Sequence, residues 1–236
     1  MAQSPSPLAT KLLNIRDYSD LIIECDDGQK FRVHRAIVCG QSSVVAAALN
    51  GPFTEAQTGV LHVSFDFQSV RRLIEFMYEG DYQVSHNPDI DILSSGVSDG
   101  TLIKQLEDMR IIDEGTDPAK LDPDVGALEL SEIISGRLIC HARMNCIADY
   151  YDVPALAGLS TTKVQNILVN EWSAKSFCYL LQESLGSTRD KNFHRMLGEE
   201  AANHIHELFD NDIFDEGGPA EGIAAYVLPK CQQHRL

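Results

Sequence analysis

The chain has 236 residues, of which 44% are hydrophobic, and its 35 Asp and Glu against 19 Lys and Arg give a formal net charge of −16. Because a nucleic acid is held mainly by Lys and Arg that neutralise its phosphates, this acidity excludes DNA and RNA as direct partners, and the same sign argument disfavours an anionic membrane surface. The apolar content supplies a core for one or two domains, and no apolar run approaches the ~20 residues that cross a bilayer.

Residues 1–18 predict a polar, proline-containing tail and a short amphipathic helix that carries Leu12, Leu13 and Ile15. The tail has no apolar stretch of the kind found in secretory signals, so we expect an intracellular protein of the nucleus or cytoplasm. The six cysteines show no Cys-x-x-Cys spacing, which indicates free thiols in a reducing compartment.

The next block, 19–83, begins with the pattern of a β-hairpin. Apolar residues alternate along 21–25 and again along 31–33, and the turn between them, 26–29, contains the Asp-Gly pair that favours positive φ. The segment Val60-Leu61-His62-Val63-Ser64 predicts a third strand.

The same block contains helix patterns. Two short segments rich in small apolar residues, 36–39 and 44–49, predict closely packed helices. Asp66 is expected to cap a longer helix whose apolar residues recur at helical spacing. That spacing leaves three charged residues on the outer side of the helix: Arg71, Arg72 and Glu75. A last short strand is expected at 82–84.

Residues 84–136 differ in composition from the rest of the chain. They hold 12 Asp and Glu against 3 Lys and Arg, a net charge of −9, and contain no aromatic residue. Such a segment buries little surface, so we predict a largely disordered acidic insertion. Within it, 101–112 has the spacing of a short helix, which is either a partner-binding peptide or an idle solvated stretch.

Residues 137–236 predict helices throughout, including one that opens at Ser173 and one over 190–209. Trp172 is expected to anchor this helical part. Strands in one small cluster followed by many helices predict an α+β fold, not alternating α/β.

Catalytic and metal-binding patterns are absent from the sequence. His204 and His206 are two residues apart, so on a helix they do not face each other and do not form a metal site with His194. No glycine-rich phosphate loop, nucleophile elbow or zinc-protease motif occurs. We therefore expect a protein that is not an enzyme and holds no cofactor or metal.

Four segments of the first block carry a resemblance to a known family. They are Ser19-Asp20-Leu21, the run from Phe31 to Ala36, Phe53-Thr54-Glu55, and the run from Phe76 to Tyr82. In this order and spacing they resemble the BTB/POZ domain, in the form common in fungal proteins. A matching pattern resumes from Arg143 to Leu156.

The resemblance implies a small β-sheet flanked by a cluster of helices, with a helical extension after it. Residues 19–83 would form the first part of the BTB/POZ-like domain and 137–160 its last helices, with 84–136 inserted between them. The helical extension would then span 161–236.

In related domains the positions of Asp20 and Arg35 form a charged pair in a groove. A carboxylate and a guanidinium make two parallel hydrogen bonds, which would offer a peptide a charged feature, whereas a purely structural pair is the alternative. His34 is a further candidate in the groove, although a lone histidine there also suits a buried group bonded to backbone. Tyr78 and Tyr82 complete the predicted partner-binding residues of this region.

Phe53 and Glu55 fit the hydrophobic-x-Glu pattern by which some family members contact a cullin scaffold, since an apolar anchor beside a charge gives affinity and orientation. The alternative is that Phe53 fills the core. In dimeric relatives, the element that corresponds to Leu12, Leu13 and Ile15 packs across a two-fold axis. Its alternative is to fold back on its own chain.

Taken together, the resemblance implies a non-enzymatic protein–protein interaction module. Its sharper form is a substrate adaptor for a cullin-type ubiquitin ligase. The alternative is a homo-oligomeric scaffold in nuclear or transcription-regulatory complexes.

Overall fold

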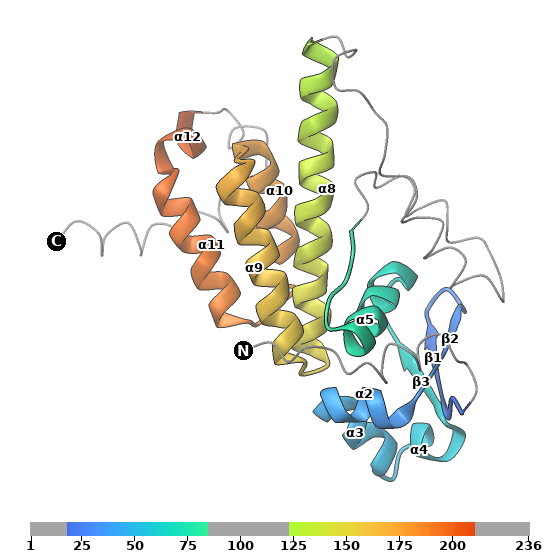
Figure 1. Ribbon diagram of the computed structural model, residues 1–236. Helices are drawn as coiled ribbons and strands as arrows, with labels where there is room; N and C mark the ends of the chain where they lie inside the picture. Colours follow the sequence, from blue (N-terminus) through green and yellow to red (C-terminus); the bar gives the residue numbers. More distant parts are fainter. Residues whose placement is uncertain (1–17, 85–122, 211–236) are drawn as a thin grey trace. The chain divides into compact units, whose positions relative to one another are not determined.

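The computed structural model describes residues 18–84 and 123–210 (Figure 1). The chain divides into two compact units, with the boundary after Leu130. We call the described residues 18–84 the sheet unit and residues 131–210 the helical unit.

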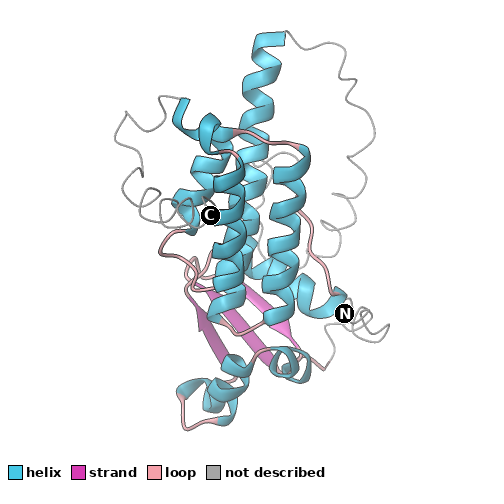
Figure 2. Cartoon of the chain, turned by 90° about the vertical axis from the view of Figure 1, so that its left-hand side faces the viewer, coloured by secondary structure: helices cyan, strands magenta, loops and turns pink. Residues whose placement is uncertain are grey.

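The sheet unit contains the predicted hairpin and third strand. Strand β1 (Leu21–Cys25) pairs antiparallel with β2 (Lys30–Val33) and parallel with β3 (Val60–Val63), which gives the strand order β2-β1-β3. Figure 2 shows these strands side by side. Gly28 takes a φ of 80° in the hairpin turn, a conformation that glycine adopts without steric cost. One face of the sheet is buried through Leu21, Ile23, Cys25, Phe31, Val33, Leu61 and Val63.

The helices of the sheet unit are α2 (Arg35–Gln41), α3 (Ser43–Asn50), α4 (Thr54–Thr58) and α5 (Phe67–Glu79). The predicted cap of α5 is confirmed, because the Asp66 carboxylate accepts a hydrogen bond from the backbone N–H of Ser69 at 2.9 Å. Gly80 ends that helix in the left-handed region. Helix α4, which directly follows Phe53, was not predicted from the sequence.

Two expectations for α5 and its exit are wrong. Arg72 and Glu75 are buried, not on the outer side of the helix. Both side chains bond the backbone of Gln83. Arg72 Nε donates to the Gln83 carbonyl oxygen at 3.1 Å, and the Gln83 N–H donates to the Glu75 carboxylate at 3.5 Å. Residues 82–84 form no strand, since these two side chains occupy the backbone groups that a neighbouring strand would pair.

The helical unit contains α9 (Pro154–Asn170), α10 (Ala174–Ser184), α11 (Lys191–Asn203), α12 (Ile205–Asp210) and most of α8 (Pro123–Tyr150). The long helices run alongside one another (Figures 1 and 2). The helix expected over 190–209 is broken at His204, which ends α11. Buried side chains from α8 to α11 fill the core, among them Leu138, Val164, Phe177, Leu180, Phe193 and Leu197.

Trp172 anchors this unit, as expected from the sequence. Its indole packs against Phe177 with ring centroids 5.1 Å apart and stacks on the imidazole of His204 at 3.7 Å. The indole N–H donates to the Glu207 carboxylate at 2.7 Å. One aromatic side chain thus joins the start of α10 to the junction between α11 and α12.

The prediction of disorder across 84–136 is wrong for its last part. Residues 85–122, with the helix expected at 101–112, lie outside the described residues. Residues 123–136 belong to α8, which begins at Pro123. Proline is tolerated in the first turn of a helix, and further along Ile134 is buried in the core of the helical unit, so helix formation continues through the acidic stretch.

Candidate functional site

The N-terminus of α2 brings together several of the predicted site residues. Asp20 lies just before β1, and its Oδ1 accepts a hydrogen bond at 2.7 Å from the backbone N–H of Arg35, the first residue of the helix. A carboxylate in this place satisfies one of the unpaired N–H groups of a helix start and is favoured by the helix dipole.

The side chain of Arg35 points to a different partner. Its guanidinium donates to the carbonyl oxygen of Leu49 and to Oδ1 of Asn50, the latter at 3.2 Å, at the C-terminal end of α3. The predicted bidentate pair between Asp20 and the guanidinium is therefore wrong in its geometry. Helix α3 ends with unpaired carbonyl groups, which attract the cation, while the helix start of α2 attracts the anion.

His34 and Tyr78 form the buried side of this cluster. The Tyr78 hydroxyl oxygen accepts from the backbone N–H of His34 at 2.7 Å and shares a second hydrogen bond with His34 Nδ1 at 2.8 Å, whose direction depends on the imidazole tautomer. His34 is thus buried, as the alternative held, but its ring bonds a tyrosine hydroxyl. Burial, and to a lesser extent the Asp20 charge, raises the pKa of Tyr78, so the hydroxyl stays protonated.

Tyr78 and Tyr82 are only 2% and 0% exposed. The prediction that their side chains contact a partner is wrong, because buried rings are not accessible to another protein. Tyr78 instead fixes the start of α2 from within the core. Asp20 is exposed and Arg35 is partly exposed, so their role in partner binding stays a prediction.

Phe53 is the clearest surface feature among the predicted site residues. Its side chain is 53% exposed, and Glu55 follows in the first turn of α4 with partial exposure. The alternative that Phe53 fills the core is wrong. An exposed aromatic ring two residues before a carboxylate gives this edge of the sheet unit an apolar contact and a charged one within three residues.

The structure also shows two positions that sequence reasoning missed. One is Gly51, where a Cβ atom would lie 2.6 Å from Cδ2 of Phe53. Gln41 donates from its side-chain amide to the carbonyl oxygen of Met77, which joins α2 to α5. No signal in the sequence indicates either contact, because Gly51 has no side chain and the partner of Gln41 is a distant backbone carbonyl.

Leu12, Leu13 and Ile15 lie outside the described residues. The chain is described from Tyr18, whose backbone has a φ of 70° and whose side chain is 88% exposed. The dimerisation role of the three apolar residues stays a prediction.

Metal-ligating side chains do not gather into a site in the part of the chain that the structure describes. Among residues 18–84 and 123–210, no three His, Cys, Asp or Glu side chains lie close enough together to hold a metal ion. The cysteines of this part of the chain are free thiols. Burial, followed by the charges of neighbouring aspartates, raises the pKa of Cys25 to about 12, which disfavours the nucleophilic thiolate. No helix in the same ranges is long and apolar enough to span a membrane.

Comparison with known families agrees with this geometry. Residues 10–98 match the model of the BTB/POZ domain family. The chain contains a BTB/POZ domain. Its sheet unit has the small sheet and surrounding helices of an α+β domain of this kind, and helices dominate the C-terminal part. BTB/POZ domains are protein–protein interaction modules in general, and this is the function that the domain brings to the chain.

The extent of the match bears on the predicted domain boundaries. The match begins before residue 19 and continues into the predicted insertion as far as residue 98, whereas 137–160 lies beyond it. The assignment of 137–160 as the last helices of the BTB/POZ domain therefore stays a prediction. No curated protein matches the chain significantly.

Proposed function

We propose that the protein is a non-enzymatic adaptor whose BTB/POZ domain docks a cullin scaffold through Phe53 and Glu55, in the nucleus or the cytoplasm. The observation that carries this proposal is the exposed Phe53 ring directly before α4, with Glu55 in the first turn of that helix. An apolar anchor that inserts into a partner pocket supplies affinity, and an adjacent charge sets orientation and association rate.

The surface around this anchor also suits a protein partner. Helix α3 contains no charged residue, and Val44 and Ala47 are exposed on it. Depletion of charge around an aromatic residue is typical of the centre of a protein interface, where polar groups would be costly to desolvate. Glu55 would then lie toward the rim, where a basic side chain of the partner can pair with it.

Binding of the full chain to a purified cullin N-terminal region tests the proposal. We expect Phe53→Ala with Glu55→Ala to weaken binding at least tenfold, as for removal of an interface anchor worth about 1.4 kcal/mol or more. Tyr179→Ala is the matched control, because Tyr179 is also an exposed aromatic residue, 43% exposed, but lies on α10 of the helical unit. Equal binding by the double variant and the wild type would contradict the proposed contact.

A homo-oligomeric scaffold in nuclear or transcription-regulatory complexes is the second candidate. It is supported by the apolar residues Leu12, Leu13 and Ile15, which fall inside the matched BTB/POZ segment that begins at residue 10. If these residues pack across a two-fold axis, charged replacements such as Leu12→Asp with Ile15→Asp convert an oligomer to a monomer. Light scattering of the full chain measures this, and a wild-type monomer at high micromolar concentration would rule out the scaffold.

A further inference from the structure

The ring of Phe53 occupies the space beside Gly51 that a side chain would fill. A Cβ atom on Gly51 would lie 2.6 Å from Cδ2 and 2.7 Å from Cε2 of the ring. Carbon atoms in contact are normally ~3.5–4.0 Å apart, so any residue other than glycine would collide with the ring where it now lies. The ring therefore rests on the backbone of Gly51.

The backbone conformation of Gly51 does not itself require glycine. Its φ of −86° and ψ of −175° lie in the extended region that all residues adopt. Its N–H donates to the carbonyl oxygen of Ala47 at 2.9 Å and so continues the last turn of α3. The constraint at this position is space, because two atoms of the Phe53 ring and the carbonyl oxygen of Ala47 lie within 2.8 Å of the place where a Cβ would be.

An uncharged strip of α3 leads toward the ring. Val44 and Ala47 are exposed on this helix, one turn apart, and Gly51 follows after a further turn. These three small or apolar residues form an uncharged strip, and the Phe53 ring lies at its end. A ring held against a backbone loses less conformational freedom when a partner binds it than a ring on a freely moving side chain.

We infer that Gly51 is a positioning residue for partner binding. Because Gly51 has no Cβ, the Phe53 ring can lie against its backbone at the end of the α3 strip, where the ring is placed to enter an apolar pocket of a protein partner. The part that concerns binding rests on the proposed function. The part that concerns the position of the ring does not, and it is measurable on the free protein.

The ring position is tested by NMR on full-length protein with 13C-labelled phenylalanine side chains. The chain has nine phenylalanines, and loss of a signal in Phe53→Ala assigns the ring of Phe53. Gly51→Ala is expected to shift that signal. Gly40→Ala is the matched control, because Gly40 lies in α2 of the same unit, has no positive φ, and has open space where its Cβ would be. An unchanged Phe53 signal in Gly51→Ala overturns the inference.

Binding is then measured with the cullin N-terminal region as the probe. Gly51→Ala is expected to weaken binding about three- to tenfold, the range set by ordering one side chain, and to have no further effect when Phe53→Ala is already present. If Phe53→Ala leaves binding unchanged, the proposed function fails while the ring measurement remains valid. If Phe53→Ala weakens binding but Gly51→Ala does not, the positioning role is wrong.

A folding defect in Gly51→Ala is also informative. A Cβ at Gly51 would lie 2.8 Å from the carbonyl oxygen of Ala47 as well, so the variant has two sources of strain. Circular dichroism of the Phe53→Ala, Gly51→Ala double variant separates them. Recovery of the fold on removal of the ring supports the inference, whereas a double variant as unfolded as Gly51→Ala assigns the defect to the carbonyl and overturns it.

Discussion

The sheet unit and the helical unit join their elements by different kinds of hydrogen bond. In the sheet unit, side chains that connect one element to another bond mostly to backbone groups, as Asp20 does to the N–H of Arg35 and Gln41 to the carbonyl of Met77. In the helical unit, many connections join two side chains, as between Arg137 and Glu171 at 2.9 Å.

The difference predicts how each unit responds to substitution. A backbone group stays in place when a side chain is replaced, so loss of its partner leaves a buried N–H or C=O unpaired at a cost of roughly 1–3 kcal/mol. Two side chains that bond only each other can be removed together, and the second removal then costs little. We therefore expect a single substitution in the sheet unit to carry the full loss of stability. In the helical unit, we expect the losses from the two members of a bonded pair to be coupled.

Tyr78→Phe gives the largest expected effect of this kind. The change keeps the buried ring but removes the hydroxyl that bonds both the backbone N–H and Nδ1 of His34. We expect a loss of about 2–3 kcal/mol in the free energy of unfolding of the sheet unit, in the upper part of the range for a buried group left unpaired. Hydrogen exchange of amides in β1 and β2 measures it specifically in this unit.

Tyr179→Phe is the matched control for Tyr78→Phe, because it removes the same atom from an exposed ring in the helical unit. Sheet amides that exchange at wild-type rates in Tyr78→Phe would show that the bonds to His34 contribute nothing. The contrast between the two units would then lose its main support.

Asn145 tests the pairwise behaviour of the helical unit. Its fully buried side chain accepts from the Thr188 hydroxyl at 2.8 Å and donates to the Asp190 carboxylate at 3.0 Å, so it ties α8 to the segment before α11. We expect Asn145→Ala to cost about 2 kcal/mol and Thr188→Val about 1 kcal/mol, with a coupling of about 1 kcal/mol in the double variant.

The measurement for Asn145 and Thr188 is denaturant unfolding followed by tryptophan fluorescence. Trp172 is the single tryptophan of the chain and lies in the helical unit, so the signal reports this unit alone. Strictly additive costs of the two substitutions would show that these side chains act independently, contrary to the comparison.

Which of these features are visible in the sequence depends on the range of the interaction. The hairpin follows from alternation over a few residues around an Asp-Gly turn, and the cap by Asp66 follows from a contact three residues away. Those interactions are local, so their pattern is written in adjacent positions. The BTB/POZ resemblance likewise rests on short segments in a fixed order.

The features that were not predicted depend on distant or backbone partners. Arg72 and Glu75 were expected on the outer side of α5 because they are charged and lie off its apolar stripe. Their hydrogen bonds with the backbone of Gln83 permit them to be buried. The hydrogen bonds of Asn145 with Thr188 and Asp190 join residues more than forty positions apart. The close approach of the Phe53 ring to Gly51 depends on the path of the backbone between them, which composition does not reveal.

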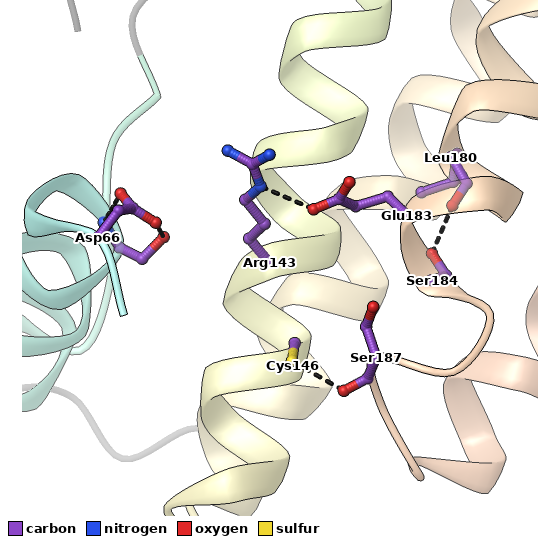
Figure 3. A network of polar contacts seen from close by, with 8 residues as sticks. Asp66, Arg143, Cys146, Leu180, Glu183, Ser184 and Ser187 are labelled. Carbon is purple, nitrogen blue, oxygen red and sulfur yellow. Dashed lines mark hydrogen bonds and ion pairs between the residues drawn. The ribbon is translucent and has the colours of Figure 1, made fainter. Parts of the chain in front are cut away.

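A surface pair in the helical unit gives a smaller effect. Arg143 Nε lies 2.8 Å from Glu183 Oε1, and both side chains are partly solvent-exposed (Figure 3). Because water screens such a pair, we expect Arg143→Ala to cost about 0.5 kcal/mol and to have almost no effect once Glu183→Ala is present. Fluorescence-monitored unfolding measures both variants, and a cost above about 1.5 kcal/mol would mean that the arginine is doing more than pairing at the surface.

Glu207 is expected to produce an effect that is confined to acid pH. Its hydrogen bond with His204, followed by the one from the Trp172 indole, lowers the pKa of this carboxyl below its ordinary value of 4.5. A carboxyl with a lowered pKa in the folded state contributes stability that is full above pH 4.5 and is lost as the pH falls through the folded pKa. Trp172 fluorescence should therefore titrate with a midpoint below pH 4.5.

The variant Glu207→Gln tests this assignment. It keeps an oxygen acceptor for the indole N–H but has no proton to gain, so the transition in fluorescence should disappear. If the transition persists, another group titrates. Because the acceptor here is a side chain and not a backbone carbonyl, the helical unit gains a dependence on pH at this contact that the bond from Gln41 to the backbone of Met77 in the sheet unit does not have.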